Sequence, residues 1–306
     1  MPKFTKLTGL IAATHTPMNP DGSLRLETVA AQAQHLIAHG ITAAFICGST
    51  GESHSLSVAE RQALARRWTE VIRGTPLQLI VHVGHNALPE AQRLAEDAQQ
   101  QGAQAIAALA PNYFKPAGVA ELVDFCAAIA ERAPELPFYF YDIPVLTGVS
   151  LPMDEFLTLG RQRIPTLAGL KFTNPDSAQL QLCLRHSEGQ FDILYGNDEY
   201  LLTALSLGVR GAVGSTYNYA APLYQRLLAA FERGDLATAR DLQYQSVQLV
   251  KLCAAFGHAR AAKAVMGLLG VDCGPVRLPL RALTPEQIAE LRRRLDAAGF
   301  FDWILR

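Results

Sequence analysis

Eight short apolar segments, separated by amphipathic ones, lie between residues 10 and 213 of the chain. They are rich in residues that favour β-strands. Several are apolar throughout, instead of alternating between apolar and polar positions. Strands of that kind belong to a parallel sheet that is covered on both faces. The predicted strands are Leu10–Ala13, Ile41–Cys47, Leu77–Val83, Ala105–Leu109, Pro137–Tyr141, Thr166–Phe172, Phe191–Tyr195 and Val209–Val213.

The segments between these strands have the spacing of helices that bury one face. Leu64, Trp68 and Val71 lie three or four residues apart and so share one side of a helix. Ser57 and Glu60 have the spacing of a capping box, so we expect this helix to begin there. Three glycines directly precede strands, where a left-handed residue suits the end of a helix: Gly40, Gly102 and Gly208.

Alternating strands and helices in this number match a (β/α)₈ barrel, which typically needs about 250 residues. A doubly wound open sheet is the alternative, although no G-x-G-x-x-G motif follows the first strand. From about Ala220 onwards only helical patterns follow. We therefore predict an α/β fold, a TIM barrel over residues 1–218, with C-terminal helices over residues 219–306 that complete and extend it.

Charge and cysteine content exclude several classes of function. The 27 basic side chains balance 28 acidic ones, so nothing attracts the protein to nucleic acid or to an anionic membrane. The five cysteines are widely spread without a C-x-x-C pair, which favours buried thiols in a reducing compartment over zinc ligands or disulfides.

Neither a membrane segment nor a metal site is predicted. The apolar run Leu7–Ala13 is too short for a signal core or a membrane span, and we expect a soluble cytoplasmic protein. His82 and His85 form an H-x-x-H pair for which no third ligand is apparent, so we expect no metal there.

Catalytic groups of such barrels lie at the carboxyl ends of the strands. The second strand is followed by Gly48-Ser49-Thr50-Gly51-Glu52, in which two hydroxyls stand between glycines. The backbone of such a loop can closely approach an anion, which here indicates a carboxylate site. An ordinary turn with a helix cap is the alternative.

Lys171 lies within the sixth apolar strand. An ammonium group that points into a barrel core is poorly solvated, which lowers its pKa and favours the neutral amine. A neutral amine can attack a ketone and form a Schiff base. The alternatives are a lysine paired with a buried carboxylate and one at the exposed end of the strand.

Other polar residues follow the fifth, seventh and eighth strands. Tyr141 could transfer protons beside Lys171, or it could be a core aromatic residue. Asp198 and Glu199 follow the seventh strand and could stabilise a helix dipole or bind the hydroxyls of a polyol. Ser215 follows the eighth strand at the same edge of the barrel.

Three dispersed motifs resemble those of one known family. They are Gly48-Ser49-Thr50-Gly51-Glu52, Tyr141-x-Ile143-Pro144 and Gly169-Leu170-Lys171. They are similar to the signatures of the dihydrodipicolinate synthase/N-acetylneuraminate lyase family of class I pyruvate aldolases, in family order and spacing over nearly the whole chain. The resemblance implies a (β/α)₈ barrel with a C-terminal helical extension, usually a homotetramer, that needs no metal or organic cofactor.

The resemblance also implies roles for individual residues. Lys171 would form the Schiff base with pyruvate, and Tyr141 would relay protons to and from the aldol oxygen. Ser49 and Thr50 would bind the carboxylate derived from pyruvate. Tyr113 resembles the tyrosine that reaches into a neighbouring subunit's site.

One position indicates the branch of the family. Dihydrodipicolinate synthases place an arginine for a dicarboxylic substrate where this chain has Leu146. Without a guanidinium a second carboxylate loses its bidentate partner. Asp142 replaces the usual asparagine or histidine, and we expect it to point away from the chemistry. Residues that match the polyol-binding set of sialic acid lyases are Thr173, Gly196, Asp198, Glu199 and Ser215.

The implied activity is the reversible cleavage of N-acetylneuraminate to N-acetylmannosamine and pyruvate, with small molecules as the only substrates. An aldolase or dehydratase for another 2-keto-3-deoxy sugar acid, or a dihydrodipicolinate synthase-like enzyme, is the alternative. A sugar-acid sensor without catalysis is a third possibility, but a sensor needs neither Lys171 nor Tyr141.

Overall fold

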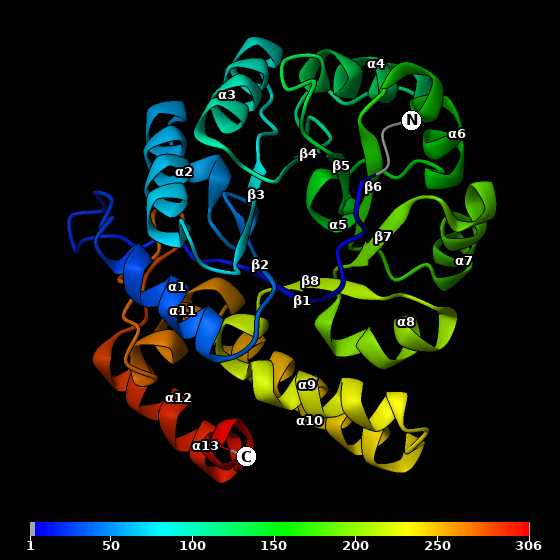
Figure 1. Cartoon of the computed structure of the whole chain (residues 1–306). Helices are drawn as coiled ribbons and strands as arrows, with labels where there is room; N and C mark the ends of the chain where they lie inside the picture. Colours follow the sequence, from blue (N-terminus) through cyan, green and yellow to red (C-terminus); the bar gives the residue numbers. More distant parts are fainter. Residues whose placement is uncertain (1–3, 306) are drawn as a thin grey trace.

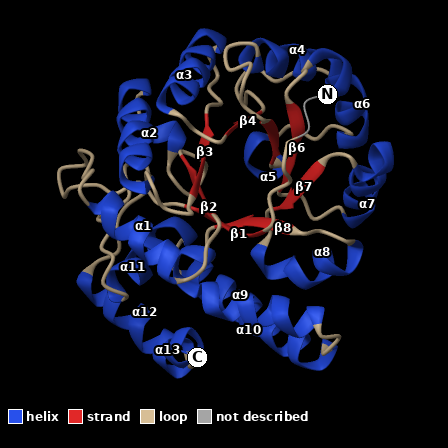
Figure 2. Ribbon diagram, in the orientation of Figure 1, coloured by secondary structure: helices blue, strands red, loops and turns tan. Residues whose placement is uncertain are grey.

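The computed structural model describes residues 4–305. Eight parallel strands form a closed barrel in sequence order, and the eighth strand pairs with the first. Figures 1 and 2 show the ring of strands enclosed by helices. The strands are β1 (Gly9–Ala13), β2 (Ala43–Ile46), β3 (Gln78–His82), β4 (Ala105–Leu109), β5 (Phe138–Asp142), β6 (Leu167–Phe172), β7 (Asp192–Tyr195) and β8 (Gly211–Gly214). The predicted barrel and its eight strands are confirmed.

Helices follow the strands and cover the barrel. They are α1 (Thr28–Ala38), α2 (Val58–Ile72), α3 (Leu88–Gln101), α4 (Val119–Ala130), α5 (Pro144–Thr147), α6 (Met153–Arg163), α7 (Ser177–Arg185), α8 (Leu201–Leu207), α9 (Tyr217–Glu232), α10 (Leu236–Ala255), α11 (His258–Leu268), α12 (Pro285–Ala297) and α13 (Phe300–Leu305). The predicted capping box at Ser57 and Glu60 is present. Gly40, Gly102 and Gly208 all have positive φ angles, as expected for the ends of helices.

Two hydrophobic clusters divide the interior. Side chains such as Ile11, Phe45 and Tyr141 fill the inside of the barrel. Alternate residues of the same strands, such as Phe140 and Leu170, pack outwards against the helices. This alternation is what sends some strand residues into the barrel and their neighbours away from it.

The C-terminal helices lie to one side of the barrel (Figure 1). Helix α9 crosses the predicted domain boundary at residue 218 and packs against β1, so the helices are continuous with the barrel. The five cysteines are buried free thiols, as predicted. Within residues 4–305 no helix is both long and apolar enough to span a bilayer.

One expectation for this region is wrong. The stretch from residue 270 to residue 284, between α11 and α12, is not helical. It contains Gly270 and Gly274, both with positive φ angles, and Pro275 and Pro279, which cannot continue a helix. Its backbone bonds to other parts of the chain instead, for example where the Cys273 carbonyl accepts from Met18 N–H at 3.1 Å.

Candidate active site

Lys171 lies inside the barrel near the carboxyl end of β6. Its neighbours across the sheet are Tyr141 on β5 and Leu194 on β7. The residue is only 2% exposed. Its Nζ atom lies 4.0 Å from the centroid of the Phe45 ring and 3.9 Å from that of Tyr141. The amine is therefore enclosed by aromatic faces and has little access to water.

Burial lowers the pKa of Lys171 to about 7. Two effects oppose this change, because the negative charge of Asp198 raises the pKa and the two ring faces favour a cation. Desolvation is the largest cause, because an enclosed ammonium loses most of its hydration. Near neutral pH about half of the molecules then carry the neutral, nucleophilic amine, against roughly one in a few thousand for an ordinary lysine.

Tyr141 presents its ring to this amine and its hydroxyl to the mouth of the barrel. The ring stands edge-on to Phe45, with centroids 5.8 Å apart, and to His82, with centroids 6.1 Å apart. Burial raises the pKa of Tyr141 to about 12, although the hydroxyls of Ser49 and Thr173 act in the opposite direction. The phenol therefore keeps its proton at neutral pH and can take part in proton relay.

Ser49 and Thr50 lie in the loop between β2 and α2, and both are half-buried. The carbonyl groups of this loop are bound by the protein itself. Gly51 O accepts from the Thr16 hydroxyl at 2.7 Å, and Ser49 O accepts from Glu52 N–H at 3.1 Å. The loop is thus held in one conformation beside Tyr141, with two hydroxyls available to an anion.

Asp198 is buried after β7 and uses only one of its carboxylate oxygens within the described chain. Oδ2 accepts hydrogen bonds from the Thr216 backbone N–H at 2.9 Å and from the Thr216 hydroxyl. Oδ1 is buried without a hydrogen-bond partner among residues 4–305. Burial raises the pKa of Asp198 to about 6. A buried acceptor of this kind is suited to a ligand hydroxyl.

Two glycines make room for these side chains. A Cβ atom on Gly214 would lie 1.9 Å from Asp198 Oδ1, and one on Gly196 would lie 1.8 Å from the Thr173 hydroxyl. Gly196, predicted as a binding residue, therefore allows Thr173 and β7 to come together. Thr173 follows Lys171 by two residues and so lies at the same mouth.

Ser215 and Glu199 lie on the side of the mouth that faces the C-terminal helices. The Ser215 hydroxyl is 3.0 Å from Nε2 of His258, the first residue of α11. Burial lowers the pKa of His258, and the negative charge of Glu199 opposes the change. Sequence reasoning missed His258, since no pattern linked it to the strand ends.

Three other residues named from the sequence lie outside the barrel interior. Tyr113 is 78% exposed and Leu146 is 60% exposed. Leu146 lines a cavity of about 300 Å³ that Ser49 also lines, so it is close to the predicted carboxylate loop. Asp142 is buried outside the barrel, where Asn174 donates to it at 3.2 Å, in agreement with the expectation that it points away.

The described residues contain no group of three or more potential metal ligands. The arrangement joins a partly neutral amine, a phenol, two hydroxyls in the loop between β2 and α2, and a carboxylate with a free acceptor. Together these groups can bind a 2-keto acid, form an imine with its ketone and bind hydroxyls further along its chain.

The chain is similar in sequence to known proteins over nearly its whole length. The model of the dihydrodipicolinate synthetase family matches residues 6–298. The chain is 42% identical over 296 residues to N-acetylneuraminate lyase of Gallus gallus, covering 95% of this chain and 96% of that protein. It is 38% identical over 302 residues to that of Homo sapiens, covering 97% and 94%.

Several solved structures have a fold similar to that of this chain. N-acetylneuraminate lyase of Proteus mirabilis superposes with a TM-score of 0.94 at 40% identity, covering 97% of this chain and all (100%) of that one. The sialic acid aldolase of Ruminococcus gnavus superposes with a TM-score of 0.88 at 28% identity, covering 95% of this chain and 98% of that one.

Proposed function

The chain belongs to the dihydrodipicolinate synthetase family, and from that premise we propose how its residues carry out catalysis. It is a carbon–carbon lyase that cleaves N-acetylneuraminate reversibly to N-acetylmannosamine and pyruvate. The enclosure of Lys171 between two aromatic rings inside the barrel is the observation that supports a Schiff-base mechanism for this cleavage.

The reaction begins with the open-chain form of the sugar acid. The neutral Lys171 amine adds to the C2 ketone, and loss of water gives an iminium ion. When the C3–C4 bond breaks, its electron pair moves towards the iminium nitrogen and forms an enamine, while C4 becomes the aldehyde of N-acetylmannosamine. Protonation of C3 and hydrolysis then release pyruvate and restore Lys171.

Tyr141 moves the proton that must leave the C4 hydroxyl. Because the pKa of Tyr141 is raised to about 12, the phenol is protonated at neutral pH. It therefore relays a proton and does not act as a phenolate base. It takes the C4 proton as its own passes to an acceptor. The substrate carboxylate, bound at Ser49 and Thr50, can be this proton acceptor because Ser49 lies beside the phenol. The enamine later takes up one proton at C3, so protons balance.

The polyhydroxylated tail binds on the other side of the mouth. The free Oδ1 atom of Asp198 accepts a hydrogen bond from a hydroxyl of this tail. The side chains of Thr173, Glu199 and Ser215 supply further polar contacts, and Gly196 leaves the space they need. Leu146 offers no cation for a second carboxylate, which favours a monocarboxylic sugar acid over a dicarboxylic substrate.

We also infer that the protein acts as a cytoplasmic homotetramer. Tyr113 and Phe114 are exposed by 78% and 86%, and their rings pack against each other with centroids 5.0 Å apart. Exposed aromatic residues beside an active-site mouth suit an interface between copies of the chain. In this assembly Tyr113 enters the site of a neighbouring subunit.

Borohydride reduction in the presence of pyruvate tests the mechanism. Reduction traps the imine, and peptide mass mapping should find the adduct on Lys171 and lose it in Lys171→Ala. Tyr141→Phe should still trap pyruvate, but its turnover of N-acetylneuraminate should fall by about 10²–10⁴-fold, as for loss of a proton-transfer group.

An adduct on another lysine, or its absence from the wild-type protein, would refute the Schiff-base proposal. Turnover should also be compared between N-acetylneuraminate and a panel of 2-keto-3-deoxy sugar acids. If another sugar acid of the panel is cleaved faster, that sugar acid is the preferred substrate, and its hydroxyls bind at Asp198 and the residues around it.

A further inference from the structure

The carboxylate loop lies between two residues with unusual backbone geometry. Cys47, before it, has a φ of 57°, and Glu52, at its end, has a φ of 56°. Residues with a side chain rarely adopt this left-handed conformation, and it persists where surrounding contacts hold it. Ser49 and Thr50 therefore lie between two strained backbone positions, which contacts with the rest of the protein must stabilise.

Buried groups of the barrel hold the first end of the loop. The Cys47 carbonyl accepts a hydrogen bond from the ring of His82, whose Nε2 atom accepts from Leu109 N–H at 3.2 Å. The guanidinium of Arg61 contacts the Cys47 thiol and donates to Gly84 O at 2.9 Å. These contacts come from β3 and the loop after it, from β4 and from α2.

A residue from outside the barrel holds the second end. The Glu52 carboxylate forms an ion pair at 2.7 Å with Lys263 of α11, and both side chains are only 3% exposed. The other Glu52 oxygen accepts from the Arg277 backbone N–H at 2.8 Å. Lys263 also donates to Pro275 O at 2.7 Å. The loop is thus tied to the C-terminal region by buried charges.

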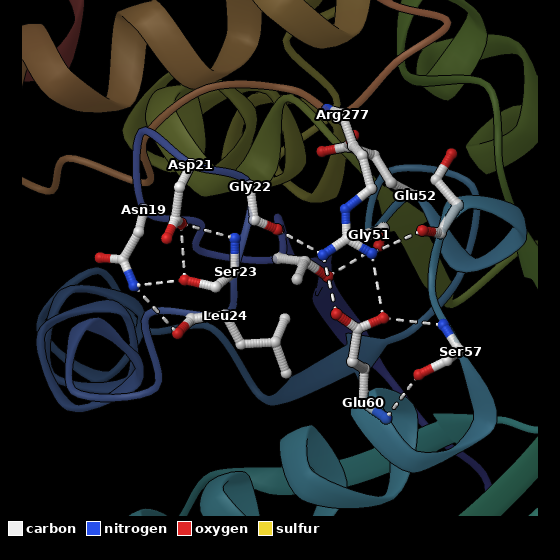
Figure 3. Close-up of polar contacts among 12 residues, drawn as sticks. Asn19, Asp21, Gly22, Ser23, Leu24, Gly51, Glu52, Ser57, Glu60 and Arg277 are labelled. Carbon is white, nitrogen blue, oxygen red and sulfur yellow. Dashed lines mark hydrogen bonds and ion pairs between the residues drawn. The ribbon is translucent and has the colours of Figure 1, made fainter.

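Arg277 extends this connection, as Figure 3 shows. Its guanidinium makes two hydrogen bonds to Glu60, at 2.8 and 3.0 Å, and donates to Ser55 O at 2.7 Å. Glu60 in turn accepts from Ser57 N–H in the capping box of α2. The segment that follows α11 therefore holds both Glu52 and the chain that leads from the loop into α2.

We propose that Glu52 and Lys263 are positioning residues for the substrate carboxylate. They do not touch the reacting atoms; their ion pair fixes the backbone at Glu52 and so sets the direction of the Ser49 and Thr50 hydroxyls. The C-terminal helices thereby form part of the active site. This inference rests on the proposed function, because it assumes that Ser49 and Thr50 bind the carboxylate of pyruvate.

Trapping of two ketones by borohydride separates positioning from mere stability. Pyruvate carries a carboxylate and acetone does not, yet both can form an imine with Lys171. In Glu52→Gln the rate of pyruvate trapping should fall at least tenfold, while acetone trapping should change less than twofold. The ratio of the two rates is the readout, alongside the melting temperature of each variant.

Two further variants serve as controls. Asp192→Asn removes a buried carboxylate at the amino end of β7, where it accepts from the Tyr139 hydroxyl at 2.9 Å, and it should lower the melting temperature without changing the ratio. Glu52→Gln/Lys263→Met leaves no unpaired charge, so it should recover melting temperature but keep the altered ratio. If Glu52→Gln alone does not fold, the ratio of the two trapping rates is measured in this double variant instead.

An unchanged ratio in both Glu52 variants would overturn the proposal, as would a ratio that recovers together with the melting temperature. If the wild-type protein traps neither ketone, the proposed Schiff-base function fails first.

Discussion

At the scale of single residues, chemistry here depends on how far a side chain is removed from water. Lys171 has the same ammonium group as a surface lysine, but burial lowers its pKa to about 7. The change that makes the amine reactive must also reduce stability, because at low pH the folded protein holds a charge that an unfolded chain would hydrate.

Lys171→Met should therefore raise the free energy of unfolding by a few kcal/mol at low pH. The folded pKa lies below the unfolded one, so the penalty is complete below about pH 7. The penalty declines as the pH rises from there towards the unfolded pKa, and it vanishes above that pKa, where the amine is neutral in both states. Urea unfolding of both proteins between pH 6 and about 10 measures the difference. If the increase in the free energy of unfolding stays constant across this pH range, the lowered pKa of Lys171 is contradicted.

Leu146→Arg tests the position that we expect to separate the branches of the family. A guanidinium at the mouth would favour a second carboxylate over an uncharged sugar tail. We expect kcat/KM for N-acetylneuraminate to fall by about tenfold, or about 1.4 kcal/mol, while borohydride still traps pyruvate. Leu146→Met, which keeps an apolar side chain, is the control. Equal kinetics in both variants would show that this position does not set specificity.

At the scale of elements, the pairing of β6 with β7 decides where Lys171 lies. Gly169, two residues before Lys171, is paired with Asp192. A Cβ atom on Gly169 would lie only 1.7 Å from the Asp192 carbonyl oxygen. The two strands can pair in this register only because the glycine has no side chain.

Gly169→Ala should accordingly lower the free energy of unfolding by about 3 kcal/mol or more, since backbone atoms must move to make room. Gly118→Ala is the control, because a Cβ atom there meets nothing within 4 Å. Its cost should stay below about 1 kcal/mol, the usual effect of alanine at a helix N-cap. Equal unfolding midpoints in urea for the two variants would contradict the close approach of Gly169 to the Asp192 carbonyl group.

At the scale of the whole molecule, the mouth of the barrel carries apolar surface that no described residue covers. Phe114 is 86% exposed and Val145 is 84% exposed. The loop that bears Phe114 and helix α5, which bears Val145, adjoin, because Asn112 and Leu146 line one cavity. Exposed apolar surface of this kind is costly in water and typical of an interface.

Phe114→Asp should therefore weaken assembly, because a charge would be buried if two copies pack together there. Light scattering should show a lower mass than for the wild-type protein at the same concentration. Phe114→Leu keeps the surface apolar and should retain the wild-type mass. If the wild-type protein is itself a monomer at micromolar concentration, the proposed homotetramer is wrong.

Much of the fold follows from local patterns. Eight apolar strands, the capping box at Ser57 and the glycines that end helices depend on neighbours a few residues away, so the amino-acid sequence alone predicts them. The motif around Lys171 also lies on a single strand. Its enclosure could be anticipated because alternate residues of a barrel strand point inwards.

Tertiary structure alone decided how distant segments meet. The ion pair of Glu52 and Lys263 joins residues more than two hundred positions apart, and the contact of Ser215 with His258 joins a strand end to a C-terminal helix. The non-helical stretch from residue 270 to residue 284 takes its shape from partners elsewhere in the chain. Periodicity reports only which face of a segment is buried, whereas these contacts depend on how the segments pack around the closed barrel.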